Sequence, residues 1–259
     1  MNMKMLNLGC GDTFHTDWVN IDFKNDHASV INHNLLSGIP FDSGKADVVY
    51  HSHVLEHFSQ EDGKKFLAEC YRVLKPGGIV RIAVPDLENI VREYLRNMED
   101  ARAGKEGAAH RYDWIKLELI DQMARHRGAG QCGAYLSQQP IPEEKYVISR
   151  WGESAKIVSA ALKREPSFMD KVKWKLRHPF AKWQSEAKRV GRFRLSGEVH
   201  LWMYDSYSLG RALTEAGFTN PVVVDAFHSS IPRWKEFELE EKNGEVRKPD
   251  TLVMEAVKR

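Results

Sequence analysis

The first ninety residues alternate short apolar segments with helical periodicity, and this pattern most constrains the fold. Five segments are rich in β-branched or aromatic residues and are bounded by turn residues. They are Met5–Leu8, Trp18–Asp22, Val30–Asn32, Asp47–Tyr50 and Ile79–Val84. Between the last two, apolar residues recur at helical spacing over Gln60–Leu74, and the turn Lys75–Gly78 follows. Strands that alternate with helices form parallel βα units, so the sequence predicts an α/β fold.

The remaining chain divides into a helical stretch and a return to strands. From Leu87 to about Leu195 the strand signals fade, and the sequence becomes helical, aromatic and charged. A helix at Ser206–Ala216 and strands at Val222–Phe227 and Leu252–Val257 then complete the sheet. We therefore predict a core at 1–95, a basic helical insertion at 96–195 that forms an acceptor side or lid, and a C-terminal completion at 196–259. The loop His228–Asp250 is long, which predicts a lid or flap.

Composition narrows the class of protein. The 259 residues are 42% hydrophobic and 29% charged, which is typical of globular domains and excludes disordered and membrane-spanning classes. A net charge of +2 is too balanced for the whole molecule to bind nucleic acid or lipid electrostatically. The three cysteines have neither metal nor redox spacing, and no leader or apolar span is evident, so we expect a cytoplasmic protein.

A glycine turn ends the first strand. Gly9 and Gly11 flank Cys10 there, and glycines let a ligand approach the backbone closely. The third glycine of the dinucleotide fingerprint is replaced by Phe14, which disfavours a dinucleotide. Asp22 ends the second strand, where its carboxylate can accept two hydrogen bonds from a ribose diol, each worth ~1.5–3 kcal/mol. A simple tight turn and an acidic helix cap are the structural alternatives.

Histidines cluster after the fourth strand, at the edge where open α/β sheets bind ligands. The residues are His51, Ser52, His53, Glu56 and His57. Imidazole, with an ordinary pKa near ~6.5, suits a general base at neutral pH. The segment also matches an inverted zinc-protease signature, but that signature belongs inside a helix and this segment follows a strand. Two alternatives stay open: a divalent ion that positions a substrate oxygen, and a purely structural cap of the next helix.

A second candidate segment precedes the late helix. His200, Trp202 and Tyr204 alternate there, so the histidine could act as a base or substrate ligand and the aromatic rings could stack on a sugar. Asp205 or Ser206 is the expected N-cap of the helix. Asp86 leaves the fifth strand at the same edge and is a further candidate for contact with the acceptor.

Together these motifs resemble the class I S-adenosylmethionine-dependent methyltransferases. More narrowly, they are similar to small bacterial methyltransferases of polysaccharide and surface-glycan biosynthesis. The resemblance is carried by Leu6–Gly11, Trp18–Asp22, Asp47–Val49, Ser52–Phe58 and Arg72–Gly78, in order, and by Trp202–Asp205 with Ala216–Phe218 near the C-terminus.

The resemblance implies a Rossmann-like, seven-stranded sheet whose last strand is antiparallel. It also implies a binding site for S-adenosylmethionine, whose product is S-adenosylhomocysteine. Asn7, Gly9, Cys10 and Gly11 would contact the methionine and ribose, Asp22 the ribose hydroxyls, Asn34 and Leu35 the adenine, and His51 and Ser52 the methionine.

Two departures from the family pattern have structural consequences. Only the nine residues Gly9–Asp17 separate the first two strands, so we expect the first helix to be reduced to a turn. Asn34 stands where many relatives carry an aspartate. Its amide oxygen could still accept from an adenine amino group, with about half the strength of a charged acceptor.

The insertion contains a strongly basic segment. Between Lys163 and Arg194 there are eleven Lys and Arg residues and three acidic ones. Interleaved aromatic residues, such as Trp174 and Trp183, fit an interfacial helix on anionic lipid or a phosphate-bearing acceptor. Charge runs are usually a solvated helical face, which is the structural alternative here, and nucleic acid is disfavoured.

The sequence thus predicts an S-adenosylmethionine-dependent methyltransferase that methylates an oxygen of a sugar or glycan intermediate. The predicted catalytic candidates are His57, His200 and His53, the substrate candidates are Trp202, Tyr204 and Asp86, and no metal is included. The acceptor is a small molecule or glycan, phosphorylated or lipid-linked in one interpretation, and contact with the inner membrane face is a further one. An N- or small-metabolite methyltransferase and a non-catalytic cofactor-binding or membrane-docking protein are the alternatives. The oligomeric state stays open.

Overall fold

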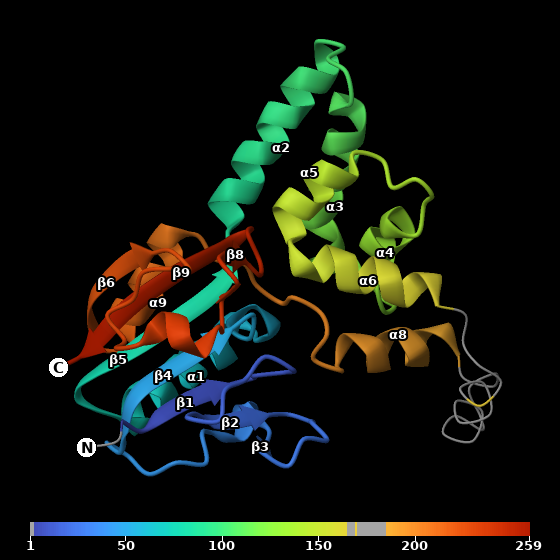
Figure 1. Ribbon diagram of the computed structural model, residues 1–259. Coiled ribbons are helices and arrows are strands. Elements are labelled where there is room, and N and C mark those ends of the chain that lie inside the picture. Colours follow the sequence, from blue (N-terminus) through green and yellow to red (C-terminus); the bar gives the residue numbers. More distant parts are fainter. Residues whose placement is uncertain (1–2, 165–168, 170–184) are drawn as a thin grey trace. The chain divides into compact units, whose positions relative to one another are not determined.

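The chain forms two compact units in a computed structural model that describes residues 3–164, 169 and 185–259 (Figure 1). One unit, here called the sheet unit, comprises Met1–Asn89 and Leu201–Arg259. The other, the helical unit, is Ile90–His200. The sequence placed the corresponding boundaries at 95 and 196.

The sheet unit is built on seven strands in the order β3-β2-β1-β4-β5-β9-β6. The strands are β1 (Met5–Leu8), β2 (Val19–Asp22), β3 (Val30–Asn32), β4 (Ala46–Ser52), β5 (Leu74–Pro85), β6 (Phe218–Val224) and β9 (Thr251–Lys258). Strands β1 to β5 pair in parallel, and β9 runs antiparallel to both β5 and β6. The predicted seven-stranded α/β sheet with an antiparallel last strand is confirmed.

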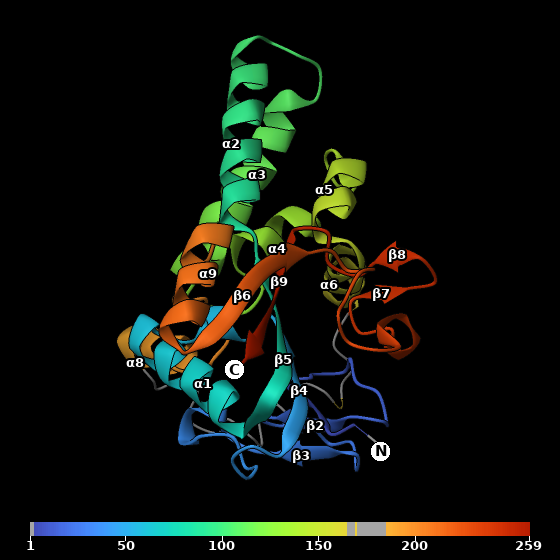
Figure 2. The ribbon, with the colours of Figure 1, turned by 90° about the vertical axis from the view of Figure 1, so that its left-hand side faces the viewer.

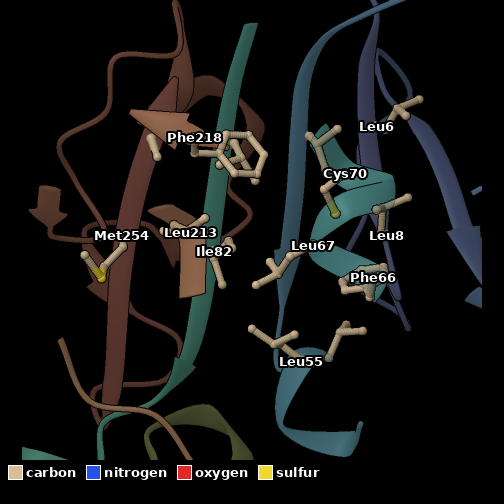
Figure 3. Packing of buried hydrophobic residues seen from close by; sticks show 14 of the residues in the cluster. Leu6, Leu8, Leu55, Phe66, Leu67, Cys70, Ile82, Leu213, Phe218 and Met254 are labelled. Carbon is tan, nitrogen blue, oxygen red and sulfur yellow. The ribbon is translucent and has the colours of Figure 1, made fainter. Parts of the chain in front are cut away.

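Helices α1 (Gln60–Val73) and α9 (Ser206–Glu215) cover one face of this sheet (Figure 2). Ser59 caps α1, and Asp205 forms a capping box with Ser208 at the start of α9, as the sequence predicted for Asp205. Between the helices and the strands lies an apolar core that includes Leu8, Phe66 and Met254 (Figure 3). Each such side chain contributes ~1.5–3 kcal/mol when it is removed from water.

The apolar cluster on the opposite face near β1 and β4 contains no α-helical residue in the described part of the chain. The chain from Gly9 to Trp18 makes only turns before β2, which confirms the reduced first helix. Instead, Trp234 and Phe237 of the short helix η4 (Trp234–Phe237) pack edge-on against Trp18. The prediction of a lid or flap at His228–Asp250 is wrong for the segment that contains η4. Its aromatic side chains pack on the face of the sheet that the missing crossover helix would have covered.

Arg81 attaches this C-terminal segment to the sheet. Its buried guanidinium donates to Glu255 at 2.7 Å and to the Asp225 carbonyl at 2.7 Å, pairs with Glu240, and lies 4.2 Å from the Trp234 ring centre. The two carboxylates raise the pKa of Arg81, whereas burial lowers it. Removing one partner of such a buried pair typically costs about 3–5 kcal/mol, so the segment is firmly attached. A hairpin, β7 (Glu241–Lys242) with β8 (Glu245–Val246), follows.

Two strand boundaries differ from the prediction. Strand β5 begins at Leu74, and the expected turn Lys75–Gly78 is an irregularity inside it, where the register with β4 shifts. Strand β6 is Phe218–Val224 and not Val222–Phe227. It ends early because the Asp225 carboxylate accepts from the backbone N–H groups of Phe227 and His228, which turns the chain.

The helical unit packs its own core. Its described helices are α2 (Leu87–Arg102, in this unit from Ile90), α3 (Ala108–Ala124), α4 (Gly130–Leu136), α5 (Glu144–Trp151), α6 (Glu153–Lys163) and α8 (Glu186–Arg194). Trp114 lies fully buried at its centre and donates to Glu118, which pairs with Arg150. Trp174 and Trp183 of the basic segment lie outside the described residues. None of the described helices is long and apolar enough to cross a membrane.

Candidate active site

The turn after β1 lies where strand order reverses, between β1 and β4, which is the usual ligand position of such sheets. Gly9 and Gly11 have φ values of 64° and 50°, a region that favours glycine. A Cβ on Gly9 would lie 2.3 Å from Val54 Cγ2, whereas a Cβ on Gly11 would meet no atom within 4 Å. Gly9 therefore permits close packing against the loop after β4, and Gly11 leaves its backbone open to a ligand.

Asp22 lies beside this turn, as the sequence predicted. The Gly11 N–H donates to Asp22 Oδ2 at 2.8 Å, and the Lys24 N–H donates to Oδ1 at 3.2 Å. The Asn25 side chain donates to the Gly11 carbonyl at 2.8 Å and ties the two loops together. A carboxylate has about four lone-pair positions, so Asp22 keeps capacity for two further donors such as the hydroxyls of a ribose.

An open hollow of about 500 Å³ adjoins these residues, lined by Asp12 and by Lys24–His27. Its size falls within the ~300–1,000 Å³ range of small-molecule sites. Phe23, directly after Asp22, is 68% exposed. The sequence motifs assigned no role to Phe23. The available signal was an aromatic residue next to Asp22, the carboxylate predicted to bind the ribose, because an aromatic ring can pack on a nucleobase.

Asn7 and Cys10 are buried and have structural roles in the turn after β1. Asn7 is buried, and its side chain donates to Asn20 Oδ1 and to the Thr13 carbonyl, both at 3.2 Å. Burial, together with the nearby charge of Asp22, raises the pKa of the Cys10 thiol to about 12. Cys10 is therefore a protonated, unreactive thiol at neutral pH.

The remaining predicted cofactor residues lie at the ends of neighbouring strands. Asn34 is exposed, and its Oδ1 accepts from the Leu36 N–H at 3.0 Å to cap the short helix η1 (Leu35–Ser37). Leu35 is buried in the core, and Ser52 ends β4 half-buried. Contacts of these side chains with a cofactor stay predictions.

His51 is fully buried under α1, with its ring 5.1 Å from that of Phe66. Within the part of the chain that the structure describes, neither ring nitrogen has a hydrogen-bond partner. Burial lowers the pKa of His51 to about 4, although the nearby Glu56 carboxylate acts in the opposite direction. His51 is therefore neutral, and its predicted contact with the methionine stays untested.

His53 is the most constrained of the predicted catalytic histidines. Its φ of 55° is unusual for a residue with a side chain and indicates local strain. Its Nδ1 lies 3.2 Å from Oε1 of the fully buried Glu56, and its Nε2 lies 2.9 Å from the hydroxyl of Thr251. A carboxylate beside Nδ1 fixes the proton there, so Nε2 becomes the acceptor. The sequence pointed to His53 and Glu56, but no signal in it pointed to Thr251.

Several charges act on His53. Burial and the charge of Lys248 lower its pKa, Glu56 raises it, and His57 lowers it slightly. The pKa of Lys248 is itself lowered by burial, against the attraction of Glu56 and Asp250. At neutral pH the net effect is a neutral imidazole with one basic nitrogen.

The other two catalytic candidates lie in different settings. His57 ends the short helix η2 (Leu55–His57) and is half-buried. His200 is the last residue of the helical unit, where it is buried and its N–H donates to the Gln122 carbonyl at 3.1 Å. Their catalytic roles stay predictions.

The predicted substrate residues are brought together within the sheet unit. Asp86 and Tyr204 form a parallel β-bridge, and Asp86 Oδ1 accepts from the Asn89 N–H at 3.1 Å. Tyr204 is buried, which raises its pKa to about 12. Trp202 is 37% exposed, and its backbone N–H donates to the Glu56 carbonyl at 3.1 Å. The segment that carries Trp202 is thus joined to the residue that pairs with His53.

Part of the chain is similar to known methyltransferases. Residues 17–82 match a family described as a methyltransferase domain. A probable S-adenosylmethionine-dependent methyltransferase of Mycolicibacterium smegmatis is 30% identical over 99 residues, which span 32% of this chain and 38% of that protein. The matched segment is thus similar to methyltransferase domains, the class that the motifs predicted.

Solved structures also match over nearly the whole chain, at low identity. A Thermotoga maritima methyltransferase, described as a possible histamine N-methyltransferase, is 13% identical over 99% of this chain and 82% of its own, with a TM-score of 0.40. A methyltransferase from Archaeoglobus fulgidus is 10% identical over 99% and 86%, with a TM-score of 0.41. A chain of a complex containing the Haloferax volcanii Trm112 methyltransferase activator is 14% identical over 99% and 82%, with a TM-score of 0.41.

Proposed function

We propose that this protein transfers a methyl group from S-adenosylmethionine to an oxygen of a sugar or glycan intermediate. The observation that carries the proposal is the hydrogen bond between the Gly11 N–H and the Asp22 carboxylate, which joins the ends of β1 and β2. It puts a carboxylate beside an open backbone turn, and a hollow of about 500 Å³ lined by Asp12 and Lys24–His27 adjoins them. These are the features that an adenosyl group requires.

The chain's own groups fit the cofactor. Asp22 would accept from the ribose hydroxyls, Gly9–Gly11 would leave room for the methionine part, and exposed Phe23 would pack on the adenine. When bound, S-adenosylmethionine supplies a methyl group on a positively charged sulfur, and the sulfur keeps the bonding electron pair as the methyl leaves. The Asp22 and Asp12 carboxylates near the turn also favour a cationic ligand.

His53 is the general base in this proposal. Its Nε2 lies 2.9 Å from the Thr251 hydroxyl, so an acceptor hydroxyl that displaces Thr251 Oγ1 meets the same nitrogen. As the new carbon–oxygen bond forms, the hydroxyl proton passes to Nε2, and Glu56 stabilises the imidazolium through Nδ1. A base of this kind contributes about 10²–10⁴-fold, and alignment of the reacting atoms supplies much of the rest.

Support for an oxygen acceptor comes from this arrangement. A hydroxyl is a weak nucleophile until it loses its proton, and a neutral imidazole held by a carboxylate meets that need. The sugar or glycan assignment rests on the sequence resemblance and on the exposed indole of Trp202.

Two measurements test the proposal. Calorimetric titration with S-adenosylhomocysteine is expected to show one site per chain. Transfer of labelled methyl from S-adenosylmethionine to nucleotide sugars, glycan extracts and small amines is expected to label a hydroxyl-bearing acceptor. Binding without transfer to any acceptor would favour a non-catalytic cofactor-binding protein, and labelled amines alone would replace the oxygen acceptor with nitrogen.

A further inference from the structure

A small groove lies between α1 and α9 on the surface of the sheet unit. Its volume is about 140 Å³. The lining consists of Gln60, Lys64, Leu67, Trp202, Tyr204, Ser208, Arg211, Ala212 and Glu215. None of these residues contributes to the contacts of the glycine turn or of His53, so the groove is separate from the methyl-transfer site.

The groove combines an aromatic surface with polar groups of both kinds. Trp202 is 37% exposed, whereas Leu67 and Tyr204 are buried and form apolar lining. Gln60 and Ser208 offer groups that donate and accept, Lys64 and Arg211 only donate, and Glu215 only accepts. A sugar ring has the matching chemistry, because its C–H face is apolar and each of its hydroxyls both donates and accepts.

The charged residues of the groove are two cations and one carboxylate. Lys64 Nζ lies 3.2 Å from Glu215 Oε2, and Arg211 Nε lies 3.8 Å from Glu215 Oε1. Both cations thus lie beside one carboxylate, whose oxygens can accept hydrogen bonds from the hydroxyls of a neutral sugar. A phosphate lacks the hydroxyl donors that Glu215 could accept.

The volume limits the ligand to one ring. It is well below the ~300–1,000 Å³ of sites that enclose a whole small molecule. The groove is also linked to the reacting edge, because the N–H groups of Leu201 and Trp202 donate to the Glu56 carbonyl at 2.7 and 3.1 Å. These hydrogen bonds hold the segment that carries Trp202 beside the residue that pairs with His53.

We propose that this groove binds one neutral pyranose ring of the acceptor, stacked on Trp202, as a subsite separate from the ring that is methylated. The proposal rests on the proposed function, because it assigns the groove to the acceptor of that reaction. It adds a substrate feature, an acceptor of at least two sugar units.

The test uses the full chain and binding alone. The probes are methyl glycosides of glucose, galactose, mannose and N-acetylglucosamine, with glucose 6-phosphate as the charged comparison. The readout is the indole N–H signal of Trp202 in ¹⁵N-labelled protein, assigned by its loss in Trp202→Phe. At least one neutral glycoside is expected to shift this signal in a saturable way.

Matched variants give the proposal its controls. Trp202→Ala is expected to weaken glycoside binding about tenfold, which corresponds to about 1.4 kcal/mol, within the range of one aromatic contact. Leu201→Ala removes the neighbouring exposed side chain, which does not line the groove, and is expected to change nothing. Both variants are expected to bind S-adenosylhomocysteine as the wild type does, which shows that they are folded.

Each outcome decides between the two proposals. If no neutral glycoside shifts the Trp202 signal at the highest soluble concentration, or if only the phosphate does so, the pyranose subsite is overturned. If glycosides bind and S-adenosylhomocysteine does not, the methyltransferase proposal fails and the groove stands as a sugar site alone. If the cofactor product binds and the glycosides do not, only the subsite fails.

Discussion

The two halves of the candidate site are built in different ways. In the cofactor half, Gly9–Gly11 and Asp22, the decisive contact joins residues eleven positions apart. In the acceptor half, His53, Glu56 and Thr251, the decisive contact joins residues 198 positions apart. A short motif can specify the cofactor half, because its residues lie in one turn and at the ends of two neighbouring strands. The acceptor half forms only when β9 pairs with β5. Substitutions in the acceptor half therefore leave the glycine motif of the cofactor half intact.

The largest expected effect is on cofactor affinity. Asp22→Ala removes two charge-assisted hydrogen bonds to the ribose, so we expect S-adenosylhomocysteine to bind about 100- to 1,000-fold more weakly in calorimetry. Asp17→Ala, which removes an exposed carboxylate of the same turn region, is the matched control and should bind normally. Equal affinity for S-adenosylhomocysteine in Asp22→Ala and wild type would mean that Asp22 does not bind the ribose, and the description of the cofactor half would be wrong.

The next effect concerns His51, on the strand between the two halves. Its pKa of about 4 in the folded protein lies below the ordinary ~6.5 of the unfolded chain, so the unfolded state binds the extra proton in this window. Stability should therefore fall as pH falls from about 6.5 to 4, by up to about 3 kcal/mol.

Urea denaturation at several pH values measures this loss. His51→Leu should lack this part of the pH dependence, and the difference between the two curves isolates it from other titrating groups. Parallel curves for the two proteins would mean that His51 is accessible to water.

The acceptor half is tested by turnover. His53→Asn keeps a polar group but removes the base, so kcat should fall about 100-fold while the affinity for S-adenosylhomocysteine stays unchanged. In wild type, burial keeps the pKa of His53 below its ordinary value, so activity should persist below pH 6.5 before protonation stops it.

Glu56→Gln provides the test of position. Glu56 raises the pKa of His53, so its neutralisation should move the acid limb of kcat to still lower pH. A His53→Asn enzyme with normal kcat, or an unmoved acid limb in Glu56→Gln, would transfer the role of base to His57 or His200.

The smallest effect distinguishes the two glycines. Both residues have positive φ, so alanine is strained at either, but only a Cβ at Gly9 overlaps Val54. Thermal or urea unfolding should show Gly9→Ala to be less stable than Gly11→Ala by about 1–3 kcal/mol. Adding Val54→Ala should restore part of that loss. Equal losses for the two single variants would mean that the loop after β4 does not pack on the turn.

The sequence predicted the parts of the fold that local patterns determine. Strands at Met5–Leu8 and Val30–Asn32, the Asp205 cap and the shortened first connection all occur as expected. Each depends on a few neighbouring residues whose preferences agree.

The failures at the C-terminal loop and in the acceptor half involve long-range packing. The aromatic residues Trp234 and Phe237 pack on a face of the sheet that has no crossover helix. The sequence does not show that this face is open, so the loop that carries them was predicted to be a lid. Thr251 offered no signal, because its partner lies on another strand end. Phe23 had a signal in its position after Asp22, yet only its exposure in the structure makes it a candidate.

A crystal structure with S-adenosylhomocysteine tests the central claim most directly. The account predicts both ribose hydroxyls within hydrogen-bond distance of the Asp22 carboxylate and the homocysteine against Gly9–Gly11. Density for the nucleoside anywhere else, or a ribose that leaves Asp22 bonded only to backbone N–H groups, would contradict it.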